Sequence, residues 1–431
     1  MNDPVDNGPT ESVRHRRVEP MTNEALEIAK GSLGTRGVGV FADNRNRPIH
    51  RWYPFVEGYS SALVARAISS ANDPSVIFDP FGGSGTTALT ASIMGLDSAF
   101  TEANPYMSWV ADVKVNATRL AALDSKTVDA LRKFANEFES ISVKPRNLGH
   151  PLLLADGSRD FFPPGVAGWI VATLEAIDGR IDGPAAQLAR LAVATSIVPA
   201  SNMLRRTDLR RRRDGEPVPV RLTTIVPKSL RMIASDIESD GHTLLGSTSQ
   251  LGVDAKASYE SPKPLTLIIT SPPYLNGTNY GRNTKLELLA MGFLGAEAEL
   301  EGLRGREITA GINNVAKRTA TPLIFESVEA VAEAVVDKTY DRRIPMMIRA
   351  YFSEMYAVFV TLAAQASPNA EFWLDIGDSR YSGVHVRTHD LLCEVASMAG
   401  WTMQRTEVIR ERRSYDGGRL SQSLIQFSRE A

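Results

Sequence analysis

Phe78-Asp79-Pro80-Phe81-Gly82-Gly83-Ser84-Gly85-Thr86-Thr87 is the stretch that decides the fold. An apolar run at 75–78 predicts a strand before it, and the pattern at 86–94 predicts a helix after it. Glycines in such a turn permit a sharp change of direction and let a ligand approach the backbone closely. A second strand is predicted at 98–101, which completes a βαβ unit, typical of a parallel sheet with helices on its faces.

Two common ligand-binding loops do not match this turn. A phosphate-binding loop of the nucleoside-triphosphatase kind needs Gly-Lys-Ser/Thr, and the turn contains no lysine. A Rossmann dinucleotide fingerprint needs G-x-G-x-x-G, and the spacing of these glycines is different. A purely structural glycine-rich turn remains an alternative.

Further sheet signals lie on both sides of a long helical region. Residues 106–240 are mainly helical in pattern, which is too long for a loop and indicates an inserted helical domain. Strands are predicted at 243–245 and 265–270, the latter an apolar, β-branched run suited to burial on both faces. A periodic helix around 348–362, a strand at 371–376, a helix at 388–399 and strands near 402–410 and 423–427 would complete an α/β fold.

Ser271-Pro272-Pro273-Tyr274 directly follows the predicted strand at 265–270. Open α/β sheets bind their ligands beyond the carboxyl ends of the strands. An amine conjugated to a planar ring is a poor nucleophile, because its lone pair is delocalised. Hydrogen bonds from the amine to the Ser271 hydroxyl oxygen and the Pro272 carbonyl oxygen would favour a tetrahedral nitrogen. Pro273 would stiffen the turn, and Tyr274 would offer a flat face to a base swung out of a helix.

Together, the two motifs resemble those of the amino-directed, site-specific DNA methyltransferases. The resemblance implies a class I S-adenosylmethionine-dependent methyltransferase with a Rossmann-like, mainly parallel seven-stranded sheet and a helical insert. Such an enzyme transfers a methyl group to the exocyclic amine of a flipped base, and it needs no metal. Serine at the first position of the catalytic motif is typical of N4-cytosine enzymes, and aspartate or asparagine of N6-adenine enzymes. Cytosine N4 is therefore the predicted target, with Ser271, Pro272, Pro273 and Tyr274 as the catalytic residues.

The same resemblance assigns residues to S-adenosylmethionine. The glycine-rich loop would hold the methionine part, Glu102 at the end of the second strand would accept the ribose hydroxyls, and the stretch 52–60 would line the methionine side. An acid that reads the adenine amine is expected after the third strand, where Ser247 stands, and Asp156 is the alternative. The predicted cofactor-binding residues are Tyr59, Ser60, Asp79, Pro80, Phe81, Gly82, Gly83, Ser84, Gly85, Thr86, Glu102, Asn104 and Ser247.

Charge is concentrated in one region, although the formal net charge is only -2. Between Arg205 and Arg231 there are nine Lys or Arg against three acidic residues. We predict that this cluster contacts phosphates of double-stranded DNA, which would position the duplex without choosing its sequence, and a solvated helix face is the alternative. The predicted nucleic-acid-binding residues are Arg205, Arg206, Arg210, Arg211, Arg212, Arg213, Asn276, Asn279 and Tyr280.

Composition adds several expectations. Neither an apolar run of about 18 to 20 residues nor an apolar signal core is present, so a cytoplasmic, nucleoid-associated protein with no membrane partner is predicted. The single cysteine, Cys393, lies in an amphipathic helix pattern, and we predict a core residue rather than the thiolate nucleophile that carbon-5 methylation needs. Asp378 is expected to border the site, and His242, His385 and His389 show no metal-ligand spacing.

We divide the chain into a mobile tail at 1–29, catalytic segments at 30–115, 241–296 and 344–431, a helical insert at 116–240 and a variable segment at 297–343. The insert and the variable segment are the candidates for target recognition. Three alternatives remain open: N6-adenine methylation of DNA, methylation of RNA or of a protein glutamine amide, and a DNA-binding subunit without catalysis. A cognate restriction or defence nuclease is a partner implied only by the resemblance.

Overall fold

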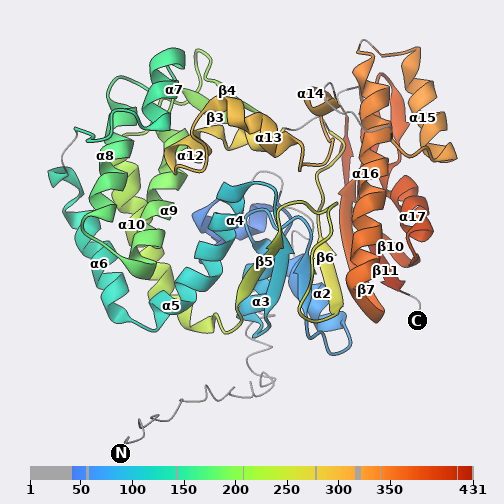
Figure 1. Cartoon of the computed structure of the whole chain (residues 1–431), viewed down its shortest axis with the longest axis horizontal. Coiled ribbons are helices and arrows are strands. Elements are labelled where there is room, and N and C mark those ends of the chain that lie inside the picture. Colours follow the sequence, from blue (N-terminus) through green and yellow to red (C-terminus); the bar gives the residue numbers. More distant parts are fainter. Residues whose placement is uncertain are drawn as a thin grey trace, which may run out of the picture.

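The computed structural model describes residues 41–54, 58–141, 144–206, 208–276, 279–315, 322–339, 341–414 and 416–429. The predicted tail at 1–29 lies outside these residues. Figure 1 shows a central sheet with a block of helices on one side and a second, smaller group of helices on the other. No helix within the described ranges is both long enough and apolar enough to cross a membrane.

A seven-stranded sheet of the described residues forms the centre, in the order β10-β11-β7-β6-β1-β2-β5. Strands β1, β2, β5, β6 and β7 run parallel, whereas β11 is antiparallel to both β7 and β10. The predicted α/β class with a Rossmann-like, mainly parallel sheet is confirmed. The strands are β1 (Ile77–Asp79), β2 (Ser98–Thr101), β5 (Thr248–Gly252), β6 (Leu265–Thr270), β7 (Ala366–Gly377), β10 (Trp401–Arg413) and β11 (Arg419–Arg429).

Helices cover both faces of this sheet because its central strands are apolar on both sides. Ile77 and Ile269 pack in a cluster with residues of one helix group, and Phe78 and Ile268 pack in a cluster with the other. Neighbouring strand residues point to opposite faces, which explains why β6 is an almost continuous apolar run. The covering helices are α2 (Ser61–Ser70) and α3 (Thr86–Ile93) for the first group, and α16 (Arg343–Gln365) and α17 (Thr388–Met398) for the second.

A helical region with its own core lies between β2 and β5 in chain order. It forms the block on the left of Figure 1. Its elements are α4 (Pro105–Asp112), a π-helical turn (Val113–Ala117), α5 (Thr118–Ala122), α6 (Ser125–Asn136), α7 (Pro151–Arg159), α8 (Val166–Asp178), α9 (Gly183–Ala200), β3 (Met203–Arg205), β4 (Leu209–Arg211) and α10 (Leu222–Asp240). The chain leaves the sheet after β2 and re-enters it at β5.

Shorter elements connect the strands on the catalytic side. They are α11 (Tyr280–Asn283), α12 (Lys285–Ala290), α13 (Leu300–Arg304), α14 (Ile312–Val315), α15 (Glu326–Val336), β8 (Ser379–Tyr381) and β9 (Val384–Val386). The strand predicted at 243–245 is wrong: Gly241–Thr243 is a 3-10 turn, and the third parallel strand is β5. Leu244 is buried in the core of the helical region, so its apolar character reflects helix packing rather than a strand.

Candidate active site

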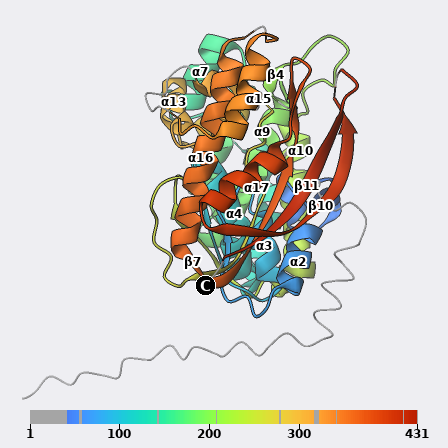
Figure 2. The ribbon, with the colours of Figure 1, turned by 90° about the vertical axis from the view of Figure 1, so that its right-hand side faces the viewer.

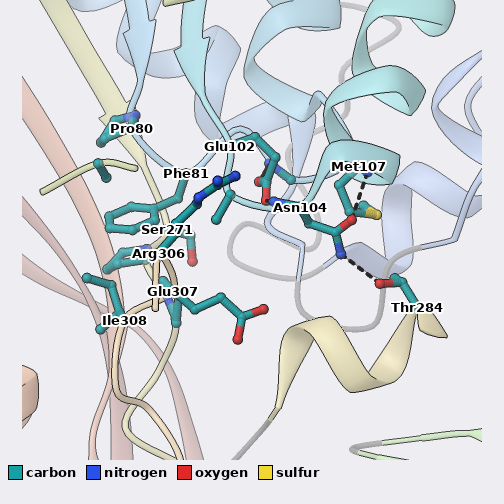
Figure 3. A pocket seen from close by; sticks show the side chains of 15 residues that line it. Pro80, Phe81, Glu102, Asn104, Met107, Ser271, Thr284, Arg306, Glu307 and Ile308 are labelled. Atoms are coloured by element: carbon teal, nitrogen blue, oxygen red, sulfur yellow. Dashed lines mark hydrogen bonds between the residues drawn. The ribbon is translucent and has the colours of Figure 1, made fainter. Parts of the chain in front are cut away.

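One pocket brings the two sequence motifs together at the carboxyl ends of β1, β2 and β6 (Figure 3). It contains about 740 Å³ of space that protein atoms do not fill, part of which is open to solvent. Its lining residues are Pro80, Phe81, Gly83, Glu102, Ala103, Asn104, Met107, Ala255, Ser271, Pro272, Pro273, Thr284, Arg306, Glu307 and Ile308.

Asp79, a buried residue at the end of β1, holds the glycine-rich loop in place. The Asp79 carboxylate accepts hydrogen bonds from the backbone N–H of Phe81 (2.9 Å) and from the hydroxyls of Thr87 (2.7 Å) and Thr270 (2.6 Å). The hydroxyl of Tyr59 donates a fourth, at 3.0 Å. Asp79 therefore shapes the loop and ties it to β6, rather than lining the pocket.

Two glycines of the loop stand where a side chain would not fit. Gly85 has a φ of +77°, and a Cβ there would lie 2.8 Å from the Cβ of Ala111. A Cβ on Gly82 would lie 2.7 Å from the ring of Phe100. The loop consequently packs directly on β2 and α4 and leaves its other side to the pocket.

Glu102 follows β2 and turns its carboxylate toward this loop. Oε2 accepts from the N–H of Gly83 at 2.7 Å, and Oε1 accepts from the N–H of Asn104 at 2.8 Å. Burial raises the pKa of Glu102 to about 7. A carboxylate held by backbone donors, next to a close-packed glycine loop and the apolar Phe81 and Met107, fits the ribose and methionine parts of S-adenosylmethionine.

The acid expected to read the adenine amine is not Ser247. Ser247 precedes β5, at the edge opposite the pocket, and both its N–H and its hydroxyl bond to Asp97. Asp156 lies in α7, where it accepts from the N–H of Phe162. Both predictions are wrong: the third parallel strand begins after Ser247 rather than before it, and Asp156 belongs to a helix rather than to the end of a strand. The acid that follows the carboxyl end of β5 is Asp254, beside the pocket residue Ala255.

Other predicted cofactor residues support the loop from behind. Tyr59 is buried below the loop, and Ser60 caps α2 by accepting from the N–H of Leu63 at 3.3 Å. The carbonyl oxygen of Ser84 accepts from the amine of buried Lys114 at 2.8 Å, and that of Thr86 accepts from the hydroxyl of Thr90 at 2.8 Å. None of Tyr59, Ser60, Ser84 and Thr86 lines the pocket.

The catalytic motif forms the opposite wall, where Ser271, Pro272 and Pro273 line the pocket. Oγ of Ser271 lies 3.4 Å from the phenolic oxygen of Tyr274, which also accepts from Nε2 of Gln422 at 3.1 Å. The Tyr274 ring packs against Gly377, where a Cβ would come within 3.0 Å of the ring. The motif is thus braced by the neighbouring strands β7 and β11.

Asp375 is a site residue that the sequence did not reveal. It lies in β7, is fully buried, and accepts from Nε2 of Gln422 at 2.8 and 3.0 Å. Burial raises the pKa of Asp375 to about 7, although hydrogen bonds from Gln422, Tyr274 and Ser271 act in the opposite direction. A carboxyl group is thereby placed behind Ser271. The feature of the sequence that points to Asp375 is an aspartate inside an otherwise apolar strand.

A third wall comes from the variable segment and from the residues after the catalytic motif. Arg306, Glu307 and Ile308 line the pocket, and burial raises the pKa of Glu307. Asn104, which caps α4, donates from Nδ2 to the hydroxyl of Thr284 at 2.6 Å, as drawn in Figure 3. This bond connects the cofactor side of the pocket to the chain that follows the catalytic motif.

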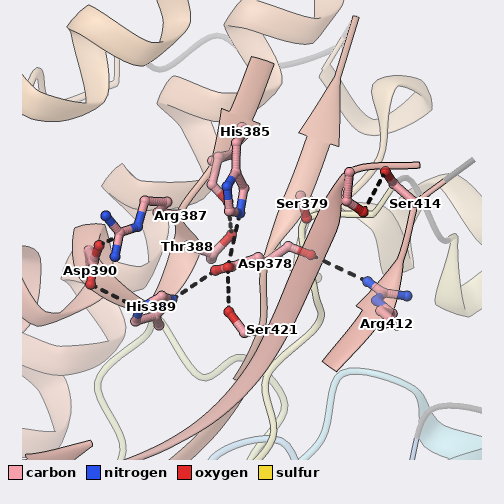
Figure 4. A network of polar contacts seen from close by, with 12 residues as sticks. Asp378, Ser379, His385, Arg387, Thr388, His389, Asp390, Arg412, Ser414 and Ser421 are labelled. Atoms are coloured by element: carbon pink, nitrogen blue, oxygen red, sulfur yellow. Dashed lines mark hydrogen bonds and ion pairs between the residues drawn. The ribbon is translucent and has the colours of Figure 1, made fainter. Parts of the chain in front are cut away.

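Asp378, one residue beyond the end of β7, is the centre of a polar network next to this site (Figure 4). Nε2 of His385 lies 3.0 Å and Nδ1 of His389 lies 2.8 Å from its carboxylate, and the hydroxyl of Ser421 donates to it at 2.8 Å. Burial opposes ionisation, but the bonds from His389 and Ser421 bring the pKa of Asp378 to about 2. The network fixes the end of β7 beside Tyr274. Among the described residues, no group of three His, Cys, Asp or Glu side chains could hold a metal ion.

Arg205 is not available to DNA, which corrects the prediction. Its guanidinium pairs with the carboxylate of Glu287 and donates to the carbonyl oxygen of Asn283 (2.9 Å) and the hydroxyl of Tyr53 (3.0 Å). The side chain of Arg205 is 14% exposed and that of Glu287 1%. The pair joins the helical region to α12 and therefore has a structural role.

The other arginines of the cluster divide into two groups. Arg210 pairs with Glu216 at 2.6 Å, and Arg212 donates to the carbonyl oxygens of Ser201 (3.1 Å) and Pro217 (2.6 Å). These two are held by the protein. The other predicted contacts, Arg206, Arg211 and Arg213, are exposed, as are Arg221, Lys228 and Arg231. Arg211 also donates to the carbonyl oxygen of Arg159 and lies 3.5 Å from the carboxylate of Asp160.

The polar residues after the catalytic motif also differ from the prediction. Asn279 is buried and caps α11 by accepting from the N–H of Arg282 at 2.9 Å, so it is not a surface contact for DNA. Asn276 is exposed. The side chain of Tyr280 lies outside the described part of the structure.

Arg205→Ala should lower the free energy of unfolding by about 3–5 kcal/mol, because it leaves the buried Glu287 carboxylate without its counter-ion. Arg213→Ala, at an exposed position of the same cluster, should change it by less than about 0.5 kcal/mol. Urea unfolding followed by circular dichroism would compare the two variants. Equal losses of unfolding free energy in the two variants would show that Arg205 has no special structural role within the cluster.

Comparison with known proteins finds relatives that cover most of the chain. No family model matches the sequence. Type II methyltransferase M.BsoBI of Geobacillus stearothermophilus is 24% identical over 440 residues, covering 90% of this chain and 84% of that protein. Type II methyltransferase M.AvaI of Nostoc sp. is 23% identical over 415 residues, covering 87% and 83%. The chain is an S-adenosylmethionine-dependent methyltransferase that is similar to these type II enzymes over most of its length.

Two solved structures also show similarity to this methyltransferase, at low scores. The rRNA methyltransferase aviRa from Streptomyces viridochromogenes is 10% identical with a TM-score of 0.26, and it covers 96% of each chain. The glycopeptide N-methyltransferase MtfA, in complex with S-adenosylmethionine, is 9% identical with a TM-score of 0.21, over 94% of this chain and 97% of that one. The fold assignment rests on the order and direction of the strands.

Proposed function

We propose that this methyltransferase transfers a methyl group to the N4 amine of a cytosine flipped out of double-stranded DNA. The observation that carries the proposal is the shared pocket: the glycine-rich loop with Glu102 forms one wall, and Ser271-Pro272-Pro273 forms another. S-adenosylmethionine, when bound, supplies an electrophilic methyl group. The chain's own task is to hold an amine with its lone pair directed at that group.

The polar groups of the catalytic wall suit this task. The Ser271 hydroxyl oxygen and the Pro272 carbonyl oxygen accept the two hydrogens of the target amine, which draws the nitrogen toward a tetrahedral shape. Methylation of a neutral amine releases one proton. Asp375 lies behind Ser271, so the released proton can pass from the amine to Oγ of Ser271 while the Ser271 hydroxyl proton passes to the ionised carboxylate of Asp375. We assign Asp375 as a positioning residue for Ser271.

Three observations support DNA as the substrate. The relatives are type II methyltransferases, and the catalytic motif resembles that of the amino-directed DNA enzymes. The exposed Arg211 ends β4 in the helical region, and the exposed Arg206 and Arg213 lie before and after this strand, where they can contact phosphates. A base can reach a pocket of this kind only after it leaves the helix stack. A cognate nuclease would be a partner if the enzyme serves restriction and modification.

Mass spectrometry of nucleosides is the direct test of the target base. DNA incubated with the enzyme and tritiated S-adenosylmethionine should acquire label, and its digest should contain N4-methylcytosine. A digest that contains N6-methyladenine and no N4-methylcytosine would show that adenine, and not cytosine, is the target base. Cofactor binding without transfer to DNA, but with transfer to RNA or to a protein amide, would overturn it.

Tyr274→Ala should raise KM for DNA by about 5- to 150-fold, since stacking on an aromatic ring is worth roughly 1–3 kcal/mol per base. Tyr274→Phe keeps the ring and loses only the contacts of the phenolic oxygen with Ser271 and Gln422. It should therefore retain most of the affinity for DNA. Steady-state kinetics would separate KM from kcat, and calorimetry should find the cofactor affinity of both variants unchanged. A weakened cofactor affinity in Tyr274→Ala would contradict the assigned role.

A further inference from the structure

The β10–β11 hairpin extends beyond the rest of the sheet. Strand β7 ends at Gly377, opposite Gln422 of β11, and Gln422 in turn pairs with Arg410 of β10. The remaining pairs of the hairpin, up to Arg413 with Arg419, have no third strand beside them. We call the described residues 410–414 and 416–419 the outer hairpin. In Figure 2 the β10–β11 ribbon rises toward the end of the molecule at which β4 lies.

This outer hairpin is basic. It contains Arg410, Arg412, Arg413 and Arg419, all exposed, against the acids Glu411 and Asp416. Asp416 is neutralised from outside the hairpin, because Arg380 pairs with it at 2.5 Å. Within the outer hairpin four arginines thus stand against two acids, one of which is already paired with Arg380. Such a concentration is greater than an edge strand needs to avoid pairing with other chains, for which single charges and bulges suffice.

The base of the hairpin is fastened to the catalytic motif. Gln422 donates to the phenolic oxygen of Tyr274, and the Ser421 hydroxyl donates to Asp378. Arg412 donates to the carbonyl oxygen of Asp378 at 3.3 Å, and its Nη2 lies 3.9 Å from the Cβ position of Gly377, against which the Tyr274 ring packs. The positive charge therefore begins at the rim of the active site and continues outward.

A duplex that delivers a base to the pocket must be held on both sides of the flipped nucleotide. The exposed arginines near β4 lie to one side of the central strands, and the β10–β11 hairpin lies to the other (Figure 1). We propose that the outer hairpin is a second contact surface for the phosphates of double-stranded DNA, opposite the arginines of the helical region. This inference rests on the proposed function, because it takes DNA as the substrate. Phosphate contacts of this kind position the duplex and carry no sequence preference.

Salt-dependent binding tests the inference in the full-length enzyme. The triple variant R410Q/R413Q/R419Q leaves Arg412 and its bond to Asp378 intact. Fluorescence anisotropy with a labelled 30-base-pair duplex of arbitrary sequence would be measured between 50 and 200 mM NaCl. The slope of log Kd against log salt should become shallower by about 2 to 3, since each phosphate contact contributes about 0.9. The Kd for the duplex should rise at every salt concentration, with the Kd for S-adenosylmethionine unchanged.

A matched control removes three exposed charges outside the outer hairpin and the pocket lining: K126Q/K133Q/K338Q, at α6 and after α15. It should keep the wild-type slope. Equal slopes for wild type and both variants, with measurable duplex binding, would overturn the inference and leave the proposed function intact. Equal losses in both triple variants would also overturn it, because the effect would then be one of net charge. A wild-type enzyme that binds no duplex at all would overturn the proposed function itself.

Discussion

Asp375→Asn is expected to lower kcat for methyl transfer by about 10²- to 10⁴-fold, the range typical of a group that assists proton movement. Asparagine has nearly the same shape and can still bond to Gln422, but it cannot take the proton of the Ser271 hydroxyl. Affinity for S-adenosylmethionine should change little, because Asp375 is not among the pocket-lining residues. Single-turnover transfer of a tritiated methyl group, alongside calorimetry, would measure both quantities.

The pH profile distinguishes this role from a merely structural one. Burial raises the pKa of Asp375 to about 7, so the active, ionised form is lost as pH falls below that value. In the wild type, kcat should rise with pH up to about 7 and then level off, and this limb should be missing in Asp375→Asn. A carboxyl group with a raised pKa in the folded state contributes stability that is lost as pH rises through that pKa. The variant should consequently be no less stable than the wild type above pH 7.

Asp337→Asn, at an exposed position after α15, is the matched control and should keep both the rate and the profile. If Asp375→Asn retains kcat within twofold, Asp375 has no part in positioning Ser271. The mechanism would then rest on the serine and the Pro272 carbonyl oxygen alone.

The second large effect is expected from Glu102→Gln. A hydrogen bond to a charged group contributes about 1.5–3 kcal/mol, so affinity for S-adenosylmethionine should fall by about 10- to 150-fold. Glutamine keeps the length of the side chain and an oxygen acceptor, but it cannot take the N–H groups of Gly83 and Asn104 and two ribose hydroxyls together. Isothermal titration would measure the loss, and duplex binding should remain as in the wild type.

Cofactor affinity should also depend on pH through Glu102. Burial raises the pKa of Glu102 to about 7, so the wild-type affinity should weaken as pH falls from 8 to 6. Glu102→Gln should show no such change. Glu139→Gln, at an exposed position between α6 and α7, is the control and should bind the cofactor normally. Wild-type affinity in Glu102→Gln would remove Glu102 from the cofactor site.

Local patterns predicted the centre of the fold well. The run at 265–270 coincides with β6, because a strand buried on both faces needs apolar residues at every position. The glycine-rich turn lies between β1 and α3 as predicted, because the backbone conformation of the turn itself requires its glycines. These features depend on neighbours in sequence, and a sequence reports such neighbours directly.

The predictions that failed concern residues whose partners lie far away in the chain. Ser247 follows the strand predicted at 243–245, but the strand that pairs with β2 is β5, which begins only after Ser247, and this pairing cannot be read from the sequence. Arg205 looked like a surface charge because Glu287, which buries it, lies 82 residues further on. Asp375 was missed because only the packing of β7 against β6 and β11 brings it to the catalytic serine.

Strand β5 joins the sheet only after the whole helical region in chain order, and it thereby connects the cofactor site to that region. Ser98 of β2 pairs with Thr248 of β5, 150 positions later in the chain. Asn116, in the π-helical turn, donates to the carbonyl oxygen of Thr248 at 2.8 Å and accepts from its N–H at 3.1 Å. A ligand that binds only the docked form of β5 stabilises that form by mass action, by about 2.7 kcal/mol at a concentration 100 times Kd. Saturation with cofactor should therefore protect the helical region against unfolding and proteolysis, so that cofactor supply controls the lifetime of a part of the molecule outside the pocket.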